Sequence, residues 1–153
     1  MTDHMVVVRK VKLLMLDTKT ISALQKTFGS YPEIIAVYLF GSILKDGENA
    51  GDIDLAVLLE QPVKKQVDIY LRLYSRLVEI FKTLEPDILF LHAASPALRF
   101  EVISTGKVIY SRDDDRRTDF EYVVCGEYMD FKYHLDLAEK ELLEVIREDA
   151  SNV

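Results

Sequence analysis

Two apolar runs flank a short polar stretch in the first third of the chain. The first runs from Glu33 to Phe40 and the second from Asp52 to Leu59, and both are rich in Val, Leu and Ile. Runs of this length and composition are typical of buried strands. The residues between them carry turn signals and are few enough for an antiparallel return. We therefore predict two neighbouring antiparallel strands at the centre of the fold.

Apolar residues at helical spacing predict three helices that cover these strands. The first should be capped by Asp17 or Thr18 and stopped by Gly29. A long crossover helix should run from Val63 to Leu84, and a shorter helix from Ser95 to Gly106. Their apolar stripes are Ile21, Leu24 and Phe28; Val67, Tyr70, Leu71, Tyr74, Leu77, Val78 and Phe81; and Leu98, Val102 and Ile103.

Further strands complete a small sheet. Asp87 to Leu91 follows the long helix, and a strand, helix, strand connection is normally parallel, so this strand should lie beside or near the Asp52 strand. Lys107 to Tyr110 predicts a short edge strand, whereas Met5 to Leu16 fits neither period and is predicted to be extended. The fold class is therefore α/β (α+β), with a small mixed sheet covered by helices.

The C-terminal part of the chain predicts one long helix. Asp113 to Arg117 is typical of a solvated connection, and Thr118 with Glu121 resembles a capping box. A helix over about 118–148 would be about 40 Å long and would outreach a small sheet. Its apolar stripe is Phe120, Val124, Tyr128, Phe131, Leu135, Ala138, Leu142 and Val145.

Length and charge limit the classes of function. The 153 residues, 49% of them hydrophobic, suit a single domain over 1–153, with a core of about 17–111 and the C-terminal helix. A net charge of −7 argues against nonspecific nucleic-acid binding. No apolar run is long enough for a membrane span, and we expect a cytoplasmic protein. Cys125, His4, His92 and His134 show no zinc-ligand spacing.

The loop between the two central strands predicts a triphosphate site. Gly41 permits a sharp turn and Ser42 can begin a helical turn, whose free backbone N–H groups cradle phosphate. Asp52 and Asp54 lie two residues apart on a strand and so project from one face. Two such carboxylates repel each other unless a hard cation such as Mg²⁺ neutralises them. Asp87 on the third strand can face them.

Gly41-Ser42 followed by Asp52-x-Asp54 resembles the signature of the DNA polymerase beta-like nucleotidyltransferase superfamily. More narrowly, the short chain and the run from Tyr128 to Lys132 resemble the minimal nucleotidyltransferases encoded beside HEPN proteins, including the MntA antitoxins. The likeness covers roughly residues 34–132. It implies a nucleotidyltransferase fold with Asp52, Asp54 and Asp87 as the catalytic and metal-binding residues.

The resemblance also implies a mechanism. The three aspartates would hold two Mg²⁺ ions, and Gly41, Ser42 and Lys45 would contact the triphosphate. AMP would pass from ATP to a tyrosine hydroxyl of a HEPN-family RNase toxin and so silence it. The spacing of these residues identifies neither the base nor the acceptor.

Each interpretation has an alternative. Asp52 and Asp87 could simply begin strands, and Asp54 and Lys45 could be solvated. The run from Tyr128 to Lys132 could be an exposed ion pair with two core aromatics. The enzyme could instead modify an antibiotic or a sugar, although the chain has little room for a substrate domain. It could also be an antitoxin that acts by binding alone.

The length of the C-terminal helix predicts an interface. Its stripe exceeds what a small core can bury, and exposed apolar patches mark binding surfaces. We therefore expect this helix to form part of the docking surface for a helical HEPN-type partner. The N-terminal segment or a second copy of the chain are the alternative occupants.

Overall fold

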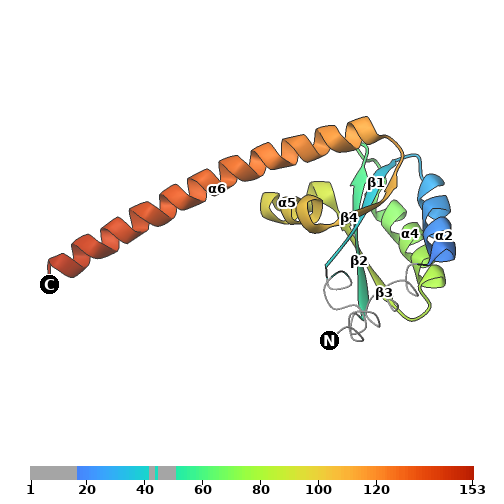
Figure 1. The fold of residues 1–153 in the computed structure, drawn as a ribbon, viewed down its shortest axis with the longest axis horizontal. Helices are drawn as coiled ribbons and strands as arrows, with labels where there is room; N and C mark the ends of the chain where they lie inside the picture. Colours follow the sequence, from blue (N-terminus) through green and yellow to red (C-terminus); the bar gives the residue numbers. More distant parts are fainter. Residues whose placement is uncertain (1–16, 42–43, 45–50) are drawn as a thin grey trace, which may run out of the picture.

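A four-stranded mixed sheet forms the centre of the protein (Figure 1). The structure is a computed structural model that describes residues 17–41, 44 and 51–153, so the predicted extended segment Met5–Leu16 lies outside the described residues. The strands lie in the order β3-β2-β1-β4. Their bounds are β1 Ile34–Phe40, β2 Asp52–Leu59, β3 Glu85–Phe90 and β4 Lys107–Ser111.

The strand pairing follows the prediction. β1 pairs antiparallel with β2, β2 pairs parallel with β3, and β4 pairs antiparallel with β1 at the sheet edge. The α/β fold class is therefore confirmed. The third strand differs in its bounds, since it begins at Glu85 rather than Asp87 and ends at Phe90, before the 3-10 turn η2, Leu91–Ala93.

Two helices cover one face of the sheet. These are α2, Thr18–Gly29, and α4, Gln66–Ile80 (Figure 1). Asp17 caps α2 as predicted, because its carboxylate accepts a hydrogen bond from the Thr20 backbone N–H at 2.7 Å. Alternate residues of β1 and β2 point toward these helices and are fully buried. The core on this face includes Leu24, Phe28, Val37, Leu39, Ile53, Leu55, Leu73 and Leu77.

The predicted stripe of α4 is partly wrong. Ile69, Leu73 and Leu77 are its buried residues, whereas Val67, Leu71 and Val78 are exposed. Both sets have helical spacing, so periodicity alone cannot choose between them. The helix is also shorter than the predicted 63–84.

The opposite face is covered by α5, Pro96–Thr105, and by the first turns of α6, Asp114–Ser151 (Figure 1). Ser95 caps α5, as predicted, by accepting a hydrogen bond from the Leu98 N–H at 3.2 Å. Val102 is fully buried against the other alternate residues of β1 and β2. This second core comprises Ile35, Ala36, Tyr38, Ala56, Leu58, Leu91 and Val102.

The start of α6 contradicts the prediction of a solvated connection. The helix begins at Asp114, and Asp113 is its N-cap, accepting a hydrogen bond from the Arg116 N–H at 3.1 Å. Acidic residues in a first turn interact favourably with the helix dipole. Arg116 also forms an ion pair with Glu60 after β2. The charged run therefore stabilises a helix start.

The predicted capping box is also wrong. Thr118 lies inside α6, and its hydroxyl donates to the Asp114 carbonyl at 2.8 Å. Glu121 instead accepts hydrogen bonds from the Tyr38 hydroxyl at 2.7 Å and from Arg117 at 2.8 Å. Burial, and secondarily this bond to Glu121, raises the pKa of Tyr38. The network joins α6 to β1.

Most of α6 extends beyond the domain (Figure 1). Its 38 residues exceed the nearly thirty that were predicted and span about 57 Å at 1.5 Å per residue. Tyr128 makes the last ring contact with α5, stacking on Phe100 at 4.0 Å between ring centroids. Every residue from Met129 onward is exposed. We call Met129–Ser151 the arm.

Candidate functional site

Gly41 directly follows β1 and has a backbone conformation that few other residues adopt. Its φ is +80°, in the left-handed region that favours glycine. A Cβ built at this position would lie 2.1 Å from Oδ2 of Asp54. The Asp54 carboxylate therefore packs directly against the backbone of Gly41, and any side chain there would displace it.

The chain turns immediately after Gly41. The backbone N–H of Leu44 donates to the Gly41 carbonyl at 3.2 Å, and Leu44 is helical. The other two residues predicted to contact the triphosphate, Ser42 and Lys45, lie outside the described residues. Their role stays a prediction.

The predicted aspartates lie on adjacent strands. Asp54 pairs with Phe40 of β1 on one side and with Asp87 of β3 on the other. Asp52 and Asp54 lie two residues apart on β2 and so share a face. Asp54 is half-buried, whereas Asp52 and Asp87 are exposed. The fold thus brings the ends of β1, β2 and β3 together.

A fourth carboxylate was missed in the sequence. Glu85 pairs with Asp52 in the parallel register, two residues before the pair of Asp54 with Asp87 along each strand. The spacing Glu85-Pro86-Asp87 could have revealed it, since alternate residues of a strand share a face. Two acidic pairs therefore lie side by side on β2 and β3.

The carboxylates fit a hard cation by donor type. Asp and Glu oxygens are the ligands that Mg²⁺ prefers. Among residues 17–41, 44 and 51–153, however, no three His, Cys, Asp or Glu side chains are grouped closely enough to hold a metal ion. The aspartates share a face and a register, but binding would require their side chains to converge. The magnesium site stays a prediction.

A hollow of about 470 Å³ borders Asp52 and Asp87 at the β3 edge. Tyr70 and Tyr74 of α4 line it, with their rings stacked at 6.2 Å between centroids. The Tyr74 hydroxyl donates to Glu85 at 3.5 Å, and burial, with this carboxylate nearby, raises the pKa of Tyr74. The hollow gives a substrate room next to two of the predicted site residues.

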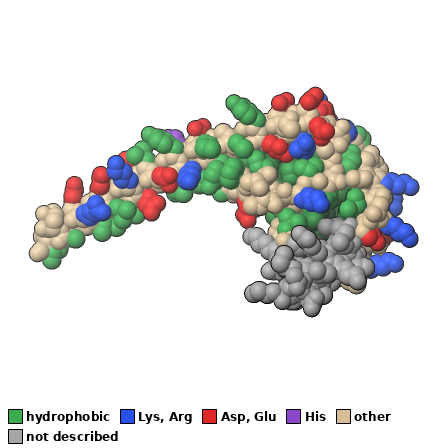
Figure 2. Space-filling view, viewed as in Figure 1, with side chains coloured by type: hydrophobic (Ala, Val, Ile, Leu, Met, Phe, Trp, Pro, Cys, Tyr) green, Lys and Arg blue, Asp and Glu red, His purple; other side chains and the backbone are tan. Residues whose placement is uncertain are grey.

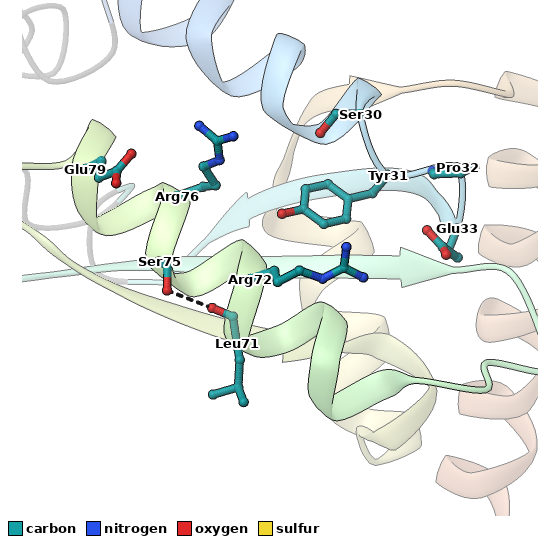
Figure 3. Close-up of a pocket in the computed structure, with 9 residues that line it drawn as sticks. All are labelled: Ser30, Tyr31, Pro32, Glu33, Leu71, Arg72, Ser75, Arg76 and Glu79. Atoms are coloured by element: carbon teal, nitrogen blue, oxygen red, sulfur yellow. Dashed lines mark hydrogen bonds between the residues drawn. The ribbon is translucent and has the colours of Figure 1, made fainter.

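A larger hollow, of about 590 Å³, lies at the opposite end of β1 from Gly41 (Figure 3). Arg72 of α4 points into it, lies 5.8 Å from the Tyr31 ring centroid and forms an ion pair with Asp68 at 2.6 Å. None of Gly41, Asp52, Asp54 and Asp87 borders this hollow. Of these two hollows, the smaller one is therefore the one bordered by predicted site residues, namely Asp52 and Asp87.

No helix in the described part of the chain has both the length and the apolar character needed to cross a membrane.

Several solved structures share this fold. One is the complex of a tri-AMPylated Shewanella oneidensis HEPN toxin with an MNT antitoxin, with a TM-score of 0.64 at 19% identity over 84% of this chain and 99% of that one. A toxin–antitoxin structure with AMP-PNP has a TM-score of 0.59 at 20% identity, covering 82% and 97% of the two chains. The MntA–HepT toxin–antitoxin structure has a TM-score of 0.57 at 20% identity, over 85% of this chain and 98% of that one.

The amino-acid sequence identifies the protein family through a match to a family model. No curated protein matches this chain. The family model described as polymerase beta, nucleotidyltransferase matches residues 22–115, more than half of the chain. That match includes Gly41, Asp52, Asp54 and Asp87, the residues that meet at the ends of β1, β2 and β3. The chain belongs to the polymerase beta nucleotidyltransferase family.

Proposed function

We propose that this protein is an MntA-type antitoxin that transfers AMP from ATP to a tyrosine hydroxyl of a HEPN-family RNase toxin in the cytoplasm and thereby silences it. The family membership supports nucleotidyl transfer. The similar structures support the partner and the nucleotide, because they include an AMPylated HEPN toxin with its antitoxin and a complex with an ATP analogue.

One observation carries the proposal. The Asp54 carboxylate packs against Gly41, and Asp87 occupies the paired position on β3. A phosphate held by the turn at Gly41 would therefore lie next to the acidic residues. An acceptor in the hollow that Asp52 and Asp87 border would lie at the neighbouring edge of the same group of acidic residues.

The chain's residues would have distinct roles in the transfer. Backbone N–H groups after Gly41, with the Ser42 hydroxyl and Lys45, would hold the β- and γ-phosphates. The acceptor hydroxyl would pass its proton to a carboxylate bordering the hollow, such as that of Asp87, as its oxygen bonds to the α-phosphorus. The bond from that phosphorus to the β-phosphate oxygen would break, and pyrophosphate would leave.

Asp52, Asp54 and Asp87 are the residues that would hold two Mg²⁺ ions. Bound there, Mg²⁺ would neutralise phosphate charge and stabilise both the attacking and the leaving oxygens. A full set of carboxylates without cations would repel the triphosphate, so we expect ATP binding to need divalent metal.

The test is incubation of the protein with its HEPN partner, ATP and Mg²⁺, followed by intact-mass measurement of both chains. We expect the wild type to add AMP to the partner. Asp54→Asn should slow transfer by about a thousandfold or more, because metal sites supply several kcal/mol of transition-state stabilisation. Asp68→Asn, an exposed aspartate on α4, is the matched control and should leave the rate unchanged.

The outcomes separate the alternatives. A stable complex without any AMP adduct would indicate an antitoxin that acts by binding alone. A wild-type rate in Asp54→Asn would contradict the site assignment. If neither complex nor adduct forms, while a small hydroxylated molecule accepts AMP, the protein is a small-molecule nucleotidyltransferase.

A further inference from the structure

One regular line of apolar residues of α6 continues beyond the domain, and further exposed apolar side chains lie outside it: Met129, Tyr133, Leu137, Leu143 and Ile146. From Val124 the residues of the regular line recur at alternating intervals of four and three residues. Val124 is buried, and Tyr128 stacks on Phe100 of α5, so the domain covers the first part of this line. The rest is uncovered: Phe131, Leu135 and Leu142 are 43%, 54% and 60% exposed. We call the line the seam: Tyr128, Phe131, Leu135, Ala138, Leu142 and Val145.

The spacing of the seam specifies the shape of what covers it. A strict alternation of three and four is the pattern of residues that pack between helices crossing at about 20°. A flat sheet or a loop would not match it. α5 lies against the first part of α6, where Phe100 stacks on Tyr128, and does not extend along the arm (Figure 1). The uncovered part therefore has room for a second helix in line with α5.

The charge of the arm favours a basic occupant. The arm carries seven acidic and three basic side chains, and Figure 2 shows red and blue groups interspersed with green hydrophobic side chains along it. The acidic residues that flank the seam are Glu139, Glu141 and Glu148, whereas Lys132 is the flanking lysine. Two copies of the arm would bring like net charges together, whereas a helix with flanking Lys or Arg would be attracted.

We infer that the seam binds a helix of the HEPN-type partner, one that carries its own apolar stripe and basic flanking residues, in an arrangement close to parallel or antiparallel. This inference rests on the proposed function for the partner's class. It goes beyond it by specifying the surface, the shape of the contact and the charge of the partner helix. Docking on the arm is independent of the nucleotide site.

The test is binding of a co-expressed HEPN-family protein, measured by size-exclusion chromatography and calorimetry without ATP. Leu135→Asp and Leu142→Asp should each weaken binding by about tenfold to a hundredfold, the effect of losing a central apolar contact. Leu137→Asp is the matched control, since Leu137 is 43% exposed on the opposite side of the same helix. It should change the affinity by less than about twofold.

A charge variant tests the second part of the inference. Glu139→Lys with Glu141→Lys should weaken the complex and reduce its salt dependence, because the attraction to a basic helix is lost. All these side chains are exposed, so the variants should keep the wild-type melting temperature and ATP affinity.

The outcomes are decisive for the docking surface. Equal binding by wild type, Leu135→Asp and Leu142→Asp would overturn the inference even if AMP transfer occurs. If the free chain sediments as a dimer that these variants dissociate, the occupant is a second copy and the inference is wrong. If Leu135→Asp and Leu142→Asp weaken partner binding, unlike Leu137→Asp, in an experiment in which neither protein gains AMP, that result would support the docking surface and contradict the proposed AMP transfer.

Discussion

The domain and the arm use apolar residues in opposite ways. In the domain, alternate residues of β1 and β2 are buried between two helical layers, and Phe28 of α2 is fully enclosed. In the arm, residues of the same type and regular spacing are exposed. Apolar periodicity therefore predicts a buried face, but the molecule that buries it can be this chain or another.

Removing large apolar side chains should give the largest difference between the two regions. Phe28→Ala should lower the free energy of unfolding by about 3–5 kcal/mol, because it leaves a cavity against Tyr110 and the sheet. Leu142→Ala in the arm should change it by less than about 0.5 kcal/mol. Urea denaturation of both variants measures this. Equal losses would mean that the arm packs on the domain in the free protein.

Adding a methyl group should have opposite effects at Gly41 in the domain and at Gly126 in α6, three residues before the arm. Gly41→Ala combines a φ of +80° with a Cβ 2.1 Å from Asp54, so we expect a loss of about 1–2 kcal/mol of stability and a larger loss of AMP transfer. Gly126→Ala meets no atom within 4 Å in α6 and should add about 0.5–1 kcal/mol through helix propensity. Thermal melts and transfer assays check both. Unchanged transfer in Gly41→Ala would contradict the role of the turn.

Removing the hydrogen bond between Tyr38 and α6 should have a smaller effect on stability than Phe28→Ala. Tyr38→Phe removes the hydrogen bond from Tyr38 to Glu121 and should cost about 1 kcal/mol at neutral pH. Burial and Glu121 raise the folded-state pKa of Tyr38 above its unfolded value of about 10. The contribution of the protonated Tyr38 hydroxyl to the free energy of unfolding is therefore complete below about pH 10. It is lost as the pH rises through the folded-state pKa.

Melting temperatures of the wild type and Tyr38→Phe across pH 9–11 would test this linkage. The wild type should lose stability more steeply than the variant above pH 10. Parallel curves would show that the hydroxyl titrates as it does in the unfolded chain.

The sequence predicted the sheet well because its signals are local. The strand bounds of β1 and β2, the parallel placement of β3 and the caps Asp17 and Ser95 follow from period, turn residues and connection handedness. The pairing of Asp54 with Asp87 follows from the same argument.

The errors arose where tertiary contacts chose between equal local patterns. α4 has two apolar stripes of helical spacing, and packing against the sheet buries only that of Ile69, Leu73 and Leu77. Glu121 fitted a capping box in sequence but bonds to Tyr38, 83 residues away. The packing of Asp54 on Gly41 had no sequence signal beyond the glycine itself.

The attachment of α6 to β1 has a mechanical consequence. Tyr38 holds the helix only three residues before Gly41, so a tilt of α6 would pivot close to the turn that follows Gly41. The arm is about 34 Å long at 1.5 Å per residue, and a tilt of about 5° at the root would move its tip by about 3 Å. A reacting hydroxyl misplaced by about 1 Å can lose a hundredfold in rate. The Phe100–Tyr128 stack and the Tyr38–Glu121 bond would therefore determine how accurately the acceptor hydroxyl of a partner bound to the arm reaches Asp54.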